Sequence, residues 1–571
     1  MLPWERLRDK LYTLEGKPYA AYKALEGEYR FDRFVLFLDY MQADPSGPPS
    51  PMRVRVDQAE VRLAGDLWAT RVKRIALEDY LARRWQEAIR KVSRGGRGGG
   101  RSAGFVIDAG NQHVLERTAC RIEEDFVEIR AGIVLPSEGR RAVPKDAQVL
   151  LLEDLPQIAG LALMADHPGR SLDPLQRHLD VAEDAEALRA QLGARGLLAF
   201  IADGAILPRE PGSDRPQLSR VVTFQSPPEL RVTLEAPHRG SVSGLGIPRG
   251  VTLITGPAFS GKSSLLSALS ACVYPHLPGD GREYCVTVPD AVYVTREGGR
   301  RVEAVSLTPF VTMLPGGEDV RRYRADHAPD LVSQVAAITE ALELGSPLLL
   351  IDEDSTAPPL LQRDAFRATL MPGASEPVVP MRDLARRLFA EHGISTILVS
   401  GTASEFAAVA DTIIGMDGFR PLDITQGAKQ AAAGTPVSTS VPEGPFGGIG
   451  QRVPAPESVS QFRGRRVRSE ARGERAIAIG REQVDMHGVA QLVEAGQARA
   501  IGDAIVFAAE RGYVDGSRSL REIVSLIDAE LSERGLEALS PFSGHPGDYA
   551  RPRRHEIAAA FNRLRTLRIR S

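Results

Sequence analysis

The first part of the chain mixes two patterns of apolar residues. Apolar side chains recur at helical spacing over residues 7–14, 77–92 and 182–193, whereas residues 35–38, 104–107 and 147–152 are short apolar runs typical of strands. Proline and glycine cluster at residues 208–216, as they do between structural units. The pattern predicts an N-terminal α+β domain over residues 1–215.

A different pattern begins at residue 216. Residues 221–224 and 230–234 are strand-like, and short β-branched runs then alternate with helical patterns as far as residue 427. Such alternation is typical of a largely parallel sheet that is covered by helices. We expect an α/β domain over residues 216–430.

The last part of the chain predicts a linker followed by helices. Residues 431–475 are rich in proline, glycine, serine and arginine and have almost no periodicity, which predicts a flexible linker. Residues 489–509 have helical spacing, and Ser519 and Glu522 form a capping box before the apolar residues 523–531. We expect a helical C-terminal domain over residues 476–571.

Composition narrows the class of protein. The chain has 571 residues, more than the roughly 250 to 300 that one core supports. Lys and Arg number 71 against 74 Asp and Glu, so no overall field attracts nucleic acid or a membrane surface. The three cysteines lack disulfide or metal spacing, and no signal peptide or membrane span is recognisable. We expect a cytoplasmic protein with no membrane partner.

The strongest chemical signal is a glycine-rich turn between a strand and a helix. Residues 256–263 fit the pattern GxxxxGK[ST], residues 251–255 before them are strand-like, and residues 264–269 begin a helix. In this context backbone N–H groups face phosphates, and glycines permit the close approach. We expect Lys262 to neutralise the β- and γ-phosphates and Ser263 to ligate Mg²⁺. The alternative is a chance match in a glycine-rich chain. The candidate nucleotide contacts are Gly256, Pro257, Ala258, Phe259, Ser260, Gly261, Lys262, Ser263 and Ser264.

A pair of carboxylates supplies the second half of this predicted site. Residues 348–351 are aliphatic and lead into Asp352 and Glu353, as in a Walker B strand. Asp352 would hold Mg²⁺ through its water shell, and Glu353 would polarise the attacking water as a general base. Lys262 and Glu353 are therefore the candidate catalytic residues. Taken alone, the run also fits a buried strand that ends in solvated acids.

A third apolar strand, residues 396–400, ends in a polar tip. Ligands bind at the carboxyl ends of parallel strands, so Ser400 and Thr402 are candidate sensors of the γ-phosphate. Both residue types also cap helices, and the sequence favours that role.

Several blocks along the chain carry a family resemblance. They read LEGKPYAAYK at 14–23, ADGAILPR at 202–209, GLGIPRGVTL at 244–253, PGDGRE at 278–283 and PRRHEIA at 552–558. With the P-loop and the acidic strand end, these blocks resemble the ABC-class ATPases, a family of bacterial and protozoan proteins distinct from transporter ATPases. The resemblance implies an ABC-type ATPase core between family-specific N- and C-terminal domains. It also implies ATP and Mg²⁺ as ligands, bound by Gly256, Gly261, Lys262, Ser263, Ser264, Asp352 and Glu353.

The same resemblance implies a second contact surface for the nucleotide. Members sandwich ATP between two chains, which implies a homodimer that forms at least transiently with ATP. A signature-like segment falls at residues 328–336, where Ser333 and Gln334 would contact the nucleotide of the opposite chain. Residues 329–332 depart from the family pattern, and Pro257 removes a backbone donor from the turn. These departures predict firm ATP binding with slow turnover.

Arginines gather in three places and suggest a further partner. They are Arg94, Arg97 and Arg101; Arg463, Arg465, Arg466, Arg468, Arg472 and Arg475; and Arg551, Arg553, Arg554, Arg563, Arg565, Arg568 and Arg570. Arginines spaced by glycine can follow the backbone of RNA or single-stranded DNA, but charged loops also keep proteins soluble. Two hypotheses remain: an ATPase that acts on nucleic acid, and a slow ATP-gated module that binds a protein partner. A transporter ATPase or a small-molecule kinase fits less well.

Overall fold

The computed structural model divides the chain into two compact units. It describes residues 1–93, 104–168, 171–361, 370, 377–401, 404–432, 446, 448–463, 467, 469–541 and 544–570. The first unit contains Met1–Ala182 with Arg534–Arg551, and the second contains Glu183–Glu533 with Pro552–Ser571. The division falls inside helix α6, Asp173–Ala194. Among the described helices, none combines the length and the apolarity needed to cross a bilayer.

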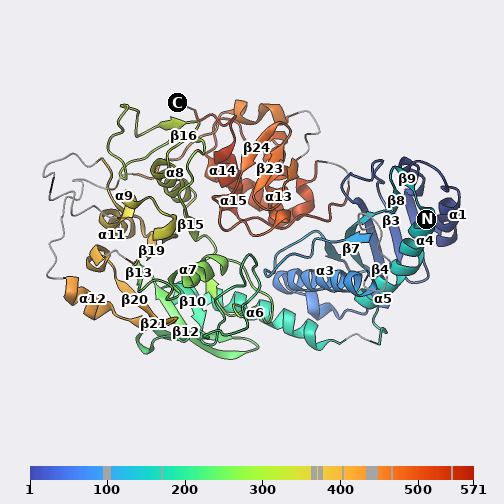
Figure 1. Ribbon diagram of the computed structural model, residues 1–571, viewed down its shortest axis with the longest axis horizontal. Helices are drawn as coiled ribbons and strands as arrows, with labels where there is room; N and C mark the ends of the chain where they lie inside the picture. The colour runs from blue at the N-terminus through green and yellow to red at the C-terminus, as the bar shows by residue number, and fades with distance from the viewer. Residues whose placement is uncertain are drawn as a thin grey trace. The chain divides into compact units, whose positions relative to one another are not determined.

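The first unit is built on a mainly antiparallel seven-stranded sheet in the order β1-β2-β3-β4-β7-β5, with β6 paired to β7. Its strands are β1 (Leu2–Pro3), β2 (Gly27–Arg30), β3 (Val35–Leu38), β4 (Ser50–Asp57), β5 (Gly104–Val106), β6 (Cys120–Ile122) and β7 (Phe126–Val134). The long helix α3, Arg71–Ser93, lies beside α5, Leu155–Leu163 (Figure 1). Apolar side chains such as Trp85 on α3 are fully buried. This unit matches the expected α+β class.

Smaller elements complete the first unit. They are helices α1 (Trp4–Tyr12), α2 (Gln58–Val61) and α4 (Pro144–Gln148), the 3-10 turns η1 (Tyr19–Leu25), η2 (Gly65–Trp68) and η8 (Leu536–Leu539), and the strand pair β8 (Ser137–Glu138) and β9 (Arg141–Ala142). Residues 147–152 are helical, so the expected strand there is wrong. The run continues from α4 through a π-helical turn, η3 (Val149–Asp154), into α5. A short aliphatic run fits a buried helix as well as a strand, and Pro144 at the helix start decides for the helix.

The second unit begins earlier than residue 216. Strand β10, Leu197–Ala202, pairs with β12, Gly240–Pro248, in a four-stranded sheet of order β11-β12-β10-β14. The outer strands are β11, Arg231–Ala236, and β14, Val286–Thr287. The proline- and glycine-rich segment near residue 210 is therefore a loop within this unit, because the strand before it joins the strands after it.

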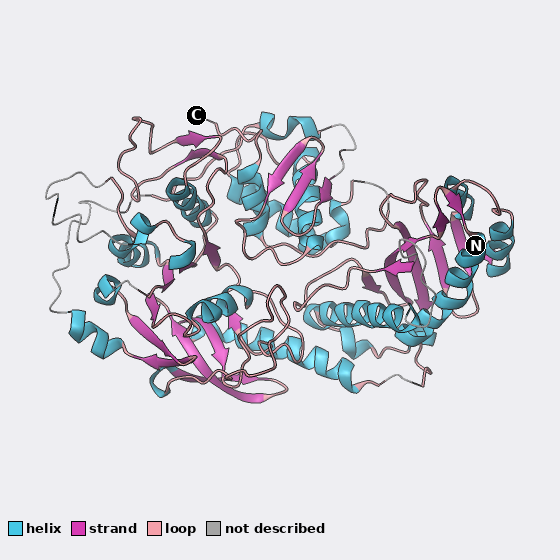
Figure 2. Cartoon of the chain, in the orientation of Figure 1, coloured by secondary structure: helices cyan, strands magenta, loops and turns pink. Residues whose placement is uncertain are grey.

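The central sheet of the second unit has the order β15-β18-β19-β13-β20-β21 and is parallel except for β21. Its strands are β13 (Val251–Thr255), β15 (Val292–Val294), β18 (Leu348–Asp352), β19 (Ser395–Val399), β20 (Thr412–Asp417) and β21 (Arg420–Asp423). The helices around it are α7 (Lys262–Ala271), α8 (Asp330–Glu343), α9 (Pro358–Leu361), α11 (Met381–His392) and α12 (Thr425–Ala432). The expected parallel α/β sheet is confirmed (Figure 2).

Short elements connect this core. They are the antiparallel pair β16 (Val302–Val305) and β17 (Tyr323–Ala325) and the 3-10 turns η4 (Pro228–Leu230), η5 (Glu353–Ser355) and η6 (Ser404–Ala408). Turn η5 follows β18 directly and contains Glu353.

The C-terminal residues of the second unit are not purely helical. Helices α13 (Ala495–Glu510), α14 (Leu520–Arg534) and α15 (Arg554–Arg563) accompany a sheet of β22 (Ser469–Ala471), β23 (Ala476–Ile479) and β24 (Glu482–Asp485). The capping box is confirmed: the backbone N–H of Ser519 donates to Glu522 over 2.7 Å, and that of Glu522 donates to the Ser519 hydroxyl over 3.3 Å.

Part of the expected linker is packed structure. The 3-10 turn η7, Pro456–Phe462, buries Val459 and Phe462. Arg452 is buried, and its Nε donates to both carboxylate oxygens of Glu343 over 2.9 Å. Residues 433–445 and 464–466 lie outside the described residues. The segment lacks periodicity in part because its backbone is irregular, although buried side chains such as Arg452 and Phe462 hold it in place.

Candidate functional site

The glycine turn joins the carboxyl end of β13 to the first residue of α7. Gly256 and Gly261 have φ angles of 141° and 98°, which residues with a Cβ rarely adopt. A Cβ on Gly256 would lie 2.4 Å from the carbonyl oxygen of Met416, so the turn packs directly against β20. Because α7 begins at Lys262, the free N–H groups of its first turn face the space above the glycine turn. This geometry favours an anion.

The middle of the turn has one buried polar group. Pro257, Ala258 and Phe259 are exposed, whereas Ser260 is buried. The Ser260 hydroxyl has no hydrogen-bond partner among the described residues. A buried hydroxyl without a partner is unfavourable by roughly 1–3 kcal/mol, so the turn fits a ligand that brings hydrogen-bonding oxygens.

Lys262 folds back over the turn. Its Nζ donates to the carbonyl oxygens of Gly256 and Pro257 over 2.9 Å and 2.7 Å. A Cβ on Gly401 would lie 4.0 Å from the same Nζ, so the end of β19 borders the lysine. The ammonium group is thus held at the mouth of the turn, where an anion can replace the two carbonyl oxygens.

Asp352 ends β18 and contacts the turn through Ser263. The carboxylate accepts a hydrogen bond from the backbone N–H of Asp354 over 3.2 Å, and the Ser263 hydroxyl lies close enough to lower the pKa of the carboxyl. Burial raises the pKa of Asp352, and these two interactions oppose the rise. A hydroxyl and a carboxylate side by side are oxygen ligands of the kind that Mg²⁺ prefers.

Glu353 is held by the end of the neighbouring strand. Its Oε2 accepts a hydrogen bond from the Ser400 hydroxyl over 2.8 Å and another from the backbone N–H of Gly401 over 2.7 Å. Ser400 therefore orients Glu353, and its interpretation as a helix cap stays a prediction. Thr402 lies outside the described residues.

The sheet brings both halves of the predicted site together. Strand β19 lies between β13 and β18 and pairs with each in parallel. Carboxyl ends of parallel strands meet at one edge, which is where ligands bind in open α/β sheets. The glycine turn, the acidic pair and Ser400 therefore lie at one edge of one sheet.

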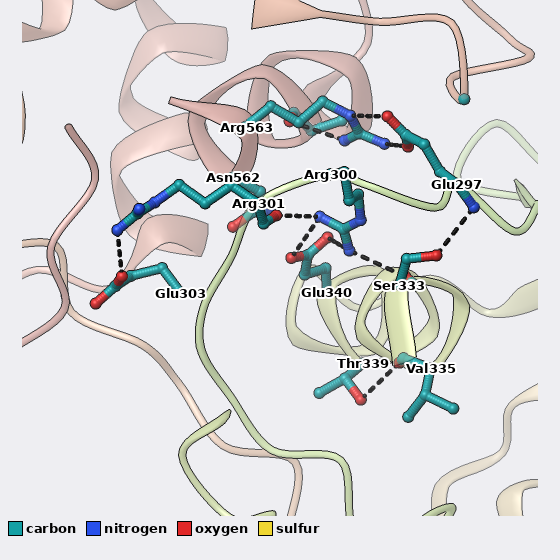
Figure 3. A network of polar contacts seen from close by, with 12 residues as sticks. Glu297, Arg300, Arg301, Glu303, Ser333, Val335, Thr339, Glu340, Asn562 and Arg563 are labelled. Atoms are coloured by element: carbon teal, nitrogen blue, oxygen red, sulfur yellow. Dashed lines mark hydrogen bonds and ion pairs between the residues drawn. The ribbon is translucent and has the colours of Figure 1, made fainter. Parts of the chain in front are cut away.

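Ser333 and Gln334, the residues predicted to contact the nucleotide of an opposite chain, lie on α8 with both side chains fully buried. The Ser333 hydroxyl accepts from the backbone N–H of Glu297 over 2.9 Å (Figure 3). It also donates to the carbonyl of Asp330 over 2.7 Å. Gln334 donates to the Thr356 hydroxyl over 3.0 Å. Their polar groups thus hold α8 against the segments after β15 and β18, and their contact with a second nucleotide stays a prediction.

Most of the C-terminal arginines have partners within the chain. Arg563 donates to Glu297, with Nε to Oε1 at 3.2 Å (Figure 3), and Arg554 pairs with Asp290 at 3.0 Å. Arg553 donates to the carbonyls of Pro289 and Ala291 and pairs with Glu556. Arg565, Arg568 and Arg570 remain exposed, and Arg94, Arg97 and Arg101 lie outside the described residues. Glu297 and Asp290 are far away in sequence and Glu556 is a near neighbour, so the local excess of arginine overstates the free charge.

Sequence reasoning missed Gly401 and Phe419. Gly401 supplies a backbone donor to Glu353. A Cβ on Gly261 would lie 3.1 Å from Cδ1 of Phe419, so this phenylalanine packs on the glycine turn. The dipeptide Asp417-Gly418 between two strand-like runs is a hairpin signal that could have located the turn.

Three family models match the chain in order. Residues 4–165 match the model described as "ATPase of the ABC class N-terminal", residues 171–449 match the P-loop domain model ABC_ATPase, and residues 468–570 match the model described as "MRB1590 C-terminal domain". Together these models account for most of the chain.

Among curated proteins, the uncharacterized protein MJ1628 of Methanocaldococcus jannaschii is 29% identical over 187 residues, or 30% of this chain. The match spans 41% of that relative's length. Among solved structures, cbiO1 from Clostridium perfringens, part of the ABC transporter complex cbiONQ, is 14% identical with a TM-score of 0.26 and covers 42% of this chain and 92% of its own. The ADP conformation of MJ1267, an ATP-binding cassette of an ABC transporter, is 12% identical with a TM-score of 0.25 and covers 42% and 96%.

Proposed function

Because this chain belongs to the ABC-class ATPases, with the N-terminal, P-loop and C-terminal domains described above, we propose that it binds Mg-ATP at the glycine turn and hydrolyses it beside Glu353. The observation that carries this proposal is the meeting of Ser263 with Asp352 next to Lys262. A hydroxyl, a carboxylate and an ammonium group at a helix N-terminus form the set that a metal-bound triphosphate requires.

Each part of the turn has a separate task in this proposal. Backbone N–H groups between Ala258 and Ser264 bind phosphate oxygens, and Ser260 gains the hydrogen-bond partner that it lacks. Lys262 exchanges its two carbonyl acceptors for the β- and γ-phosphates. Ser263 and Asp352 hold Mg²⁺, which neutralises charge on the phosphates when it is bound.

Glu353 acts as the general base. The hydrogen bonds from Ser400 and Gly401 both end on Oε2, which fixes the carboxylate relative to Lys262. An oriented carboxylate accepts a proton from the attacking water as the water oxygen bonds to the γ-phosphorus. The bond between the γ-phosphorus and the bridging oxygen breaks, and that oxygen leaves with ADP. Pro257 lacks a backbone donor in the turn, and we propose that turnover is correspondingly slow.

We favour a protein partner over a nucleic acid for this ATPase. The internal ion pairs of Arg554 and Arg563 leave fewer cations for a phosphodiester backbone. In this proposal ATP brings two chains together at their glycine turns and changes the surface offered to the partner. Exposed Arg565 and Arg568 keep the nucleic-acid hypothesis testable.

The test is ATP turnover by the purified full chain. We expect turnover that stops when EDTA removes Mg²⁺ and that is nearly abolished in Glu353→Gln, while ATP binding persists. Chromatography of Glu353→Gln with ATP should show a dimer that the ADP form lacks. Turnover that survives both EDTA and Glu353→Gln contradicts the proposed site.

The choice of partner is tested in the same assay with RNA, single-stranded DNA and double-stranded DNA at low and high salt. The protein-partner proposal expects no stimulation by any of them. Stimulation at low salt that is lost at high salt and in Arg565→Ala/Arg568→Ala would favour a nucleic-acid partner instead.

A further inference from the structure

The turn between β20 and β21 places a phenylalanine where the backbone disfavours one. Asp417 pairs with Arg420, so Gly418 and Phe419 are the two residues of the hairpin loop. Their φ angles are 52° and 68°. A two-residue loop with positive φ at both positions normally carries Asn or Gly, and a bulky residue in this region is strained by about 1–3 kcal/mol. We therefore expect the Phe419 side chain to make an interaction that offsets the backbone strain.

The Phe419 ring lies against the glycine turn and is half open to solvent. A Cβ on Gly261 would lie 3.1 Å from Cδ1 of Phe419 and 3.7 Å from its Cα. The same side chain is 51% exposed. One part of the residue thus packs at the start of α7, and the rest of the ring is available to a ligand bound there.

The two neighbours of β13 mark the two ends of that ligand. Strand β19 on one side carries Ser400 and Gly401, which hold Glu353, so the phosphate that is attacked lies on that side. Strand β20 pairs with β13 on the other side and leads into Phe419. A linear triphosphate with its γ end toward β19 has its nucleoside end toward β20.

We propose that Phe419 is the platform on which the adenine ring stacks. This inference rests on the proposed ATP site and names the residue that recognises the base. An aromatic ring offers a flat apolar face to a purine, and such stacking contributes about 1–3 kcal/mol per base. Stacking depends on the flat face of the base and not on the hydrogen-bonding groups at its edge. The site therefore accepts purine nucleoside triphosphates as a class, and it binds pyrimidine nucleotides less tightly because their flat face is smaller.

A purely structural role for Phe419 makes a different prediction. If the ring only shields Gly261, its removal weakens every ligand of the turn equally, because the turn itself loosens. Inorganic tripolyphosphate shares the phosphates of ATP but has no base. The comparison of these two ligands therefore separates stacking from support of the turn.

The experiment is calorimetric titration of the full chain with Mg-ATP and with Mg-tripolyphosphate. For Phe419→Ala we expect ATP affinity to fall about tenfold, within the range for loss of a stacking partner, while tripolyphosphate affinity stays within about twofold. Phe419→Trp should restore ATP binding. Phe419→Asn, which suits the positive φ, should unfold at a temperature no lower than the wild type and still lose ATP affinity.

Phe259 provides the matched control. It is also a phenylalanine at positive φ, 60°, but its side chain is 95% exposed and belongs to the glycine turn. Because Phe259 takes part in the turn through its backbone, Phe259→Ala should change both affinities together and leave the ratio of ATP to tripolyphosphate affinity unchanged. The proposal is overturned if Phe419→Ala leaves ATP affinity unaltered, if it weakens both ligands equally, or if Phe259→Ala alone lowers the ratio. Lys262→Ala should weaken both ligands, and if it weakens neither, the ATP site itself is wrong, whatever Phe419 does.

Discussion

The Ser400 hydroxyl donates a 2.8 Å hydrogen bond to the Glu353 carboxylate, which joins the ends of β19 and β18. The backbone N–H of Gly401 donates to the same oxygen over 2.7 Å. A Cβ on Gly401 would lie 3.7 Å from the carbonyl oxygen of Gly256, so this pair also borders the glycine turn. The proposed general base is therefore fixed by the strand between the two halves of the site.

Glu353→Gln should separate binding from hydrolysis. The amide keeps the shape of the side chain but is a poor base, so turnover should fall about 100-fold or more. ATP affinity, measured by calorimetry, should stay within about threefold of the wild type, a difference of less than 1 kcal/mol. A variant that hydrolyses ATP at the wild-type rate would assign the base to another residue.

Ser400→Ala should have a smaller effect of the same kind. It removes the hydrogen bond from the Ser400 hydroxyl to Oε2 and leaves the one from Gly401, and a hydrogen bond to a charged group contributes roughly 1.5–3 kcal/mol. We expect kcat to fall about tenfold with KM nearly unchanged, because Ser400 orients the base and does not hold the phosphates. Ser400→Thr keeps a hydroxyl and should recover part of the activity. A rise in KM alone would instead make Ser400 a phosphate contact.

The ion pair between Arg563 and Glu297 should stabilise the second unit. The two side chains are only 7% and 16% exposed, and removal of one partner of a buried pair is destabilising by roughly 3 kcal/mol. Arg563→Ala should lower the urea midpoint of the full chain accordingly. Arg565→Ala, an exposed neighbour, should change stability by less than about 0.5 kcal/mol. Equal effects of the two substitutions would contradict a specific role for the pair.

Glu128 should make the first unit sensitive to acid. Burial tends to raise the pKa of this carboxyl, but hydrogen bonds from Arg55 and Arg130 and the charges of Arg130 and Arg53 lower it to about 2. Since the folded pKa is below the ordinary value of 4.5, the stabilisation is complete above pH 4.5 and is lost as the pH falls toward 2.

Amide hydrogen exchange of β7 in the full chain checks this prediction. At pH 7, Glu128→Gln should lower protection by roughly 3 kcal/mol relative to the wild type. The difference between the two proteins should shrink as the pH falls from 5 to 3. A difference that is independent of pH would mean that the arginines do not depend on the charge of Glu128.

The central sheet and the glycine turn could be predicted from sequence because local pattern determines them. β-branched runs, a helix start and the two glycines of the GxxxxGK[ST] pattern all predict the same structure around Lys262. The capping box at Ser519 is local in the same way. Where several local signals coincide, the prediction holds, whereas the single aliphatic run at residues 147–152 fits a strand and a helix equally and is helical in the structure.

The remaining features depend on contacts between distant residues. Serine is a residue type that commonly caps helices, and only the pairing of β18 with β19 makes Ser400 a partner of Glu353. Ser333 lies in the segment where the signature contact is expected, but its hydroxyl accepts a hydrogen bond from the backbone N–H of Glu297, which is distant in sequence. The pairing of β10 with β12 moves the domain boundary, and no local signal near residue 210 reveals it.

The most direct measurement of the central claim is the affinity of Lys262→Ala for Mg-ATP by calorimetry. In the proposed site the Lys262 ammonium group contacts the phosphates, and loss of a charged hydrogen-bond donor weakens binding by roughly 1.5–3 kcal/mol, or about ten- to hundredfold. We expect that loss in a variant that melts at the same temperature as the wild type without nucleotide. Unchanged affinity in the folded variant would contradict an ATP site at this turn.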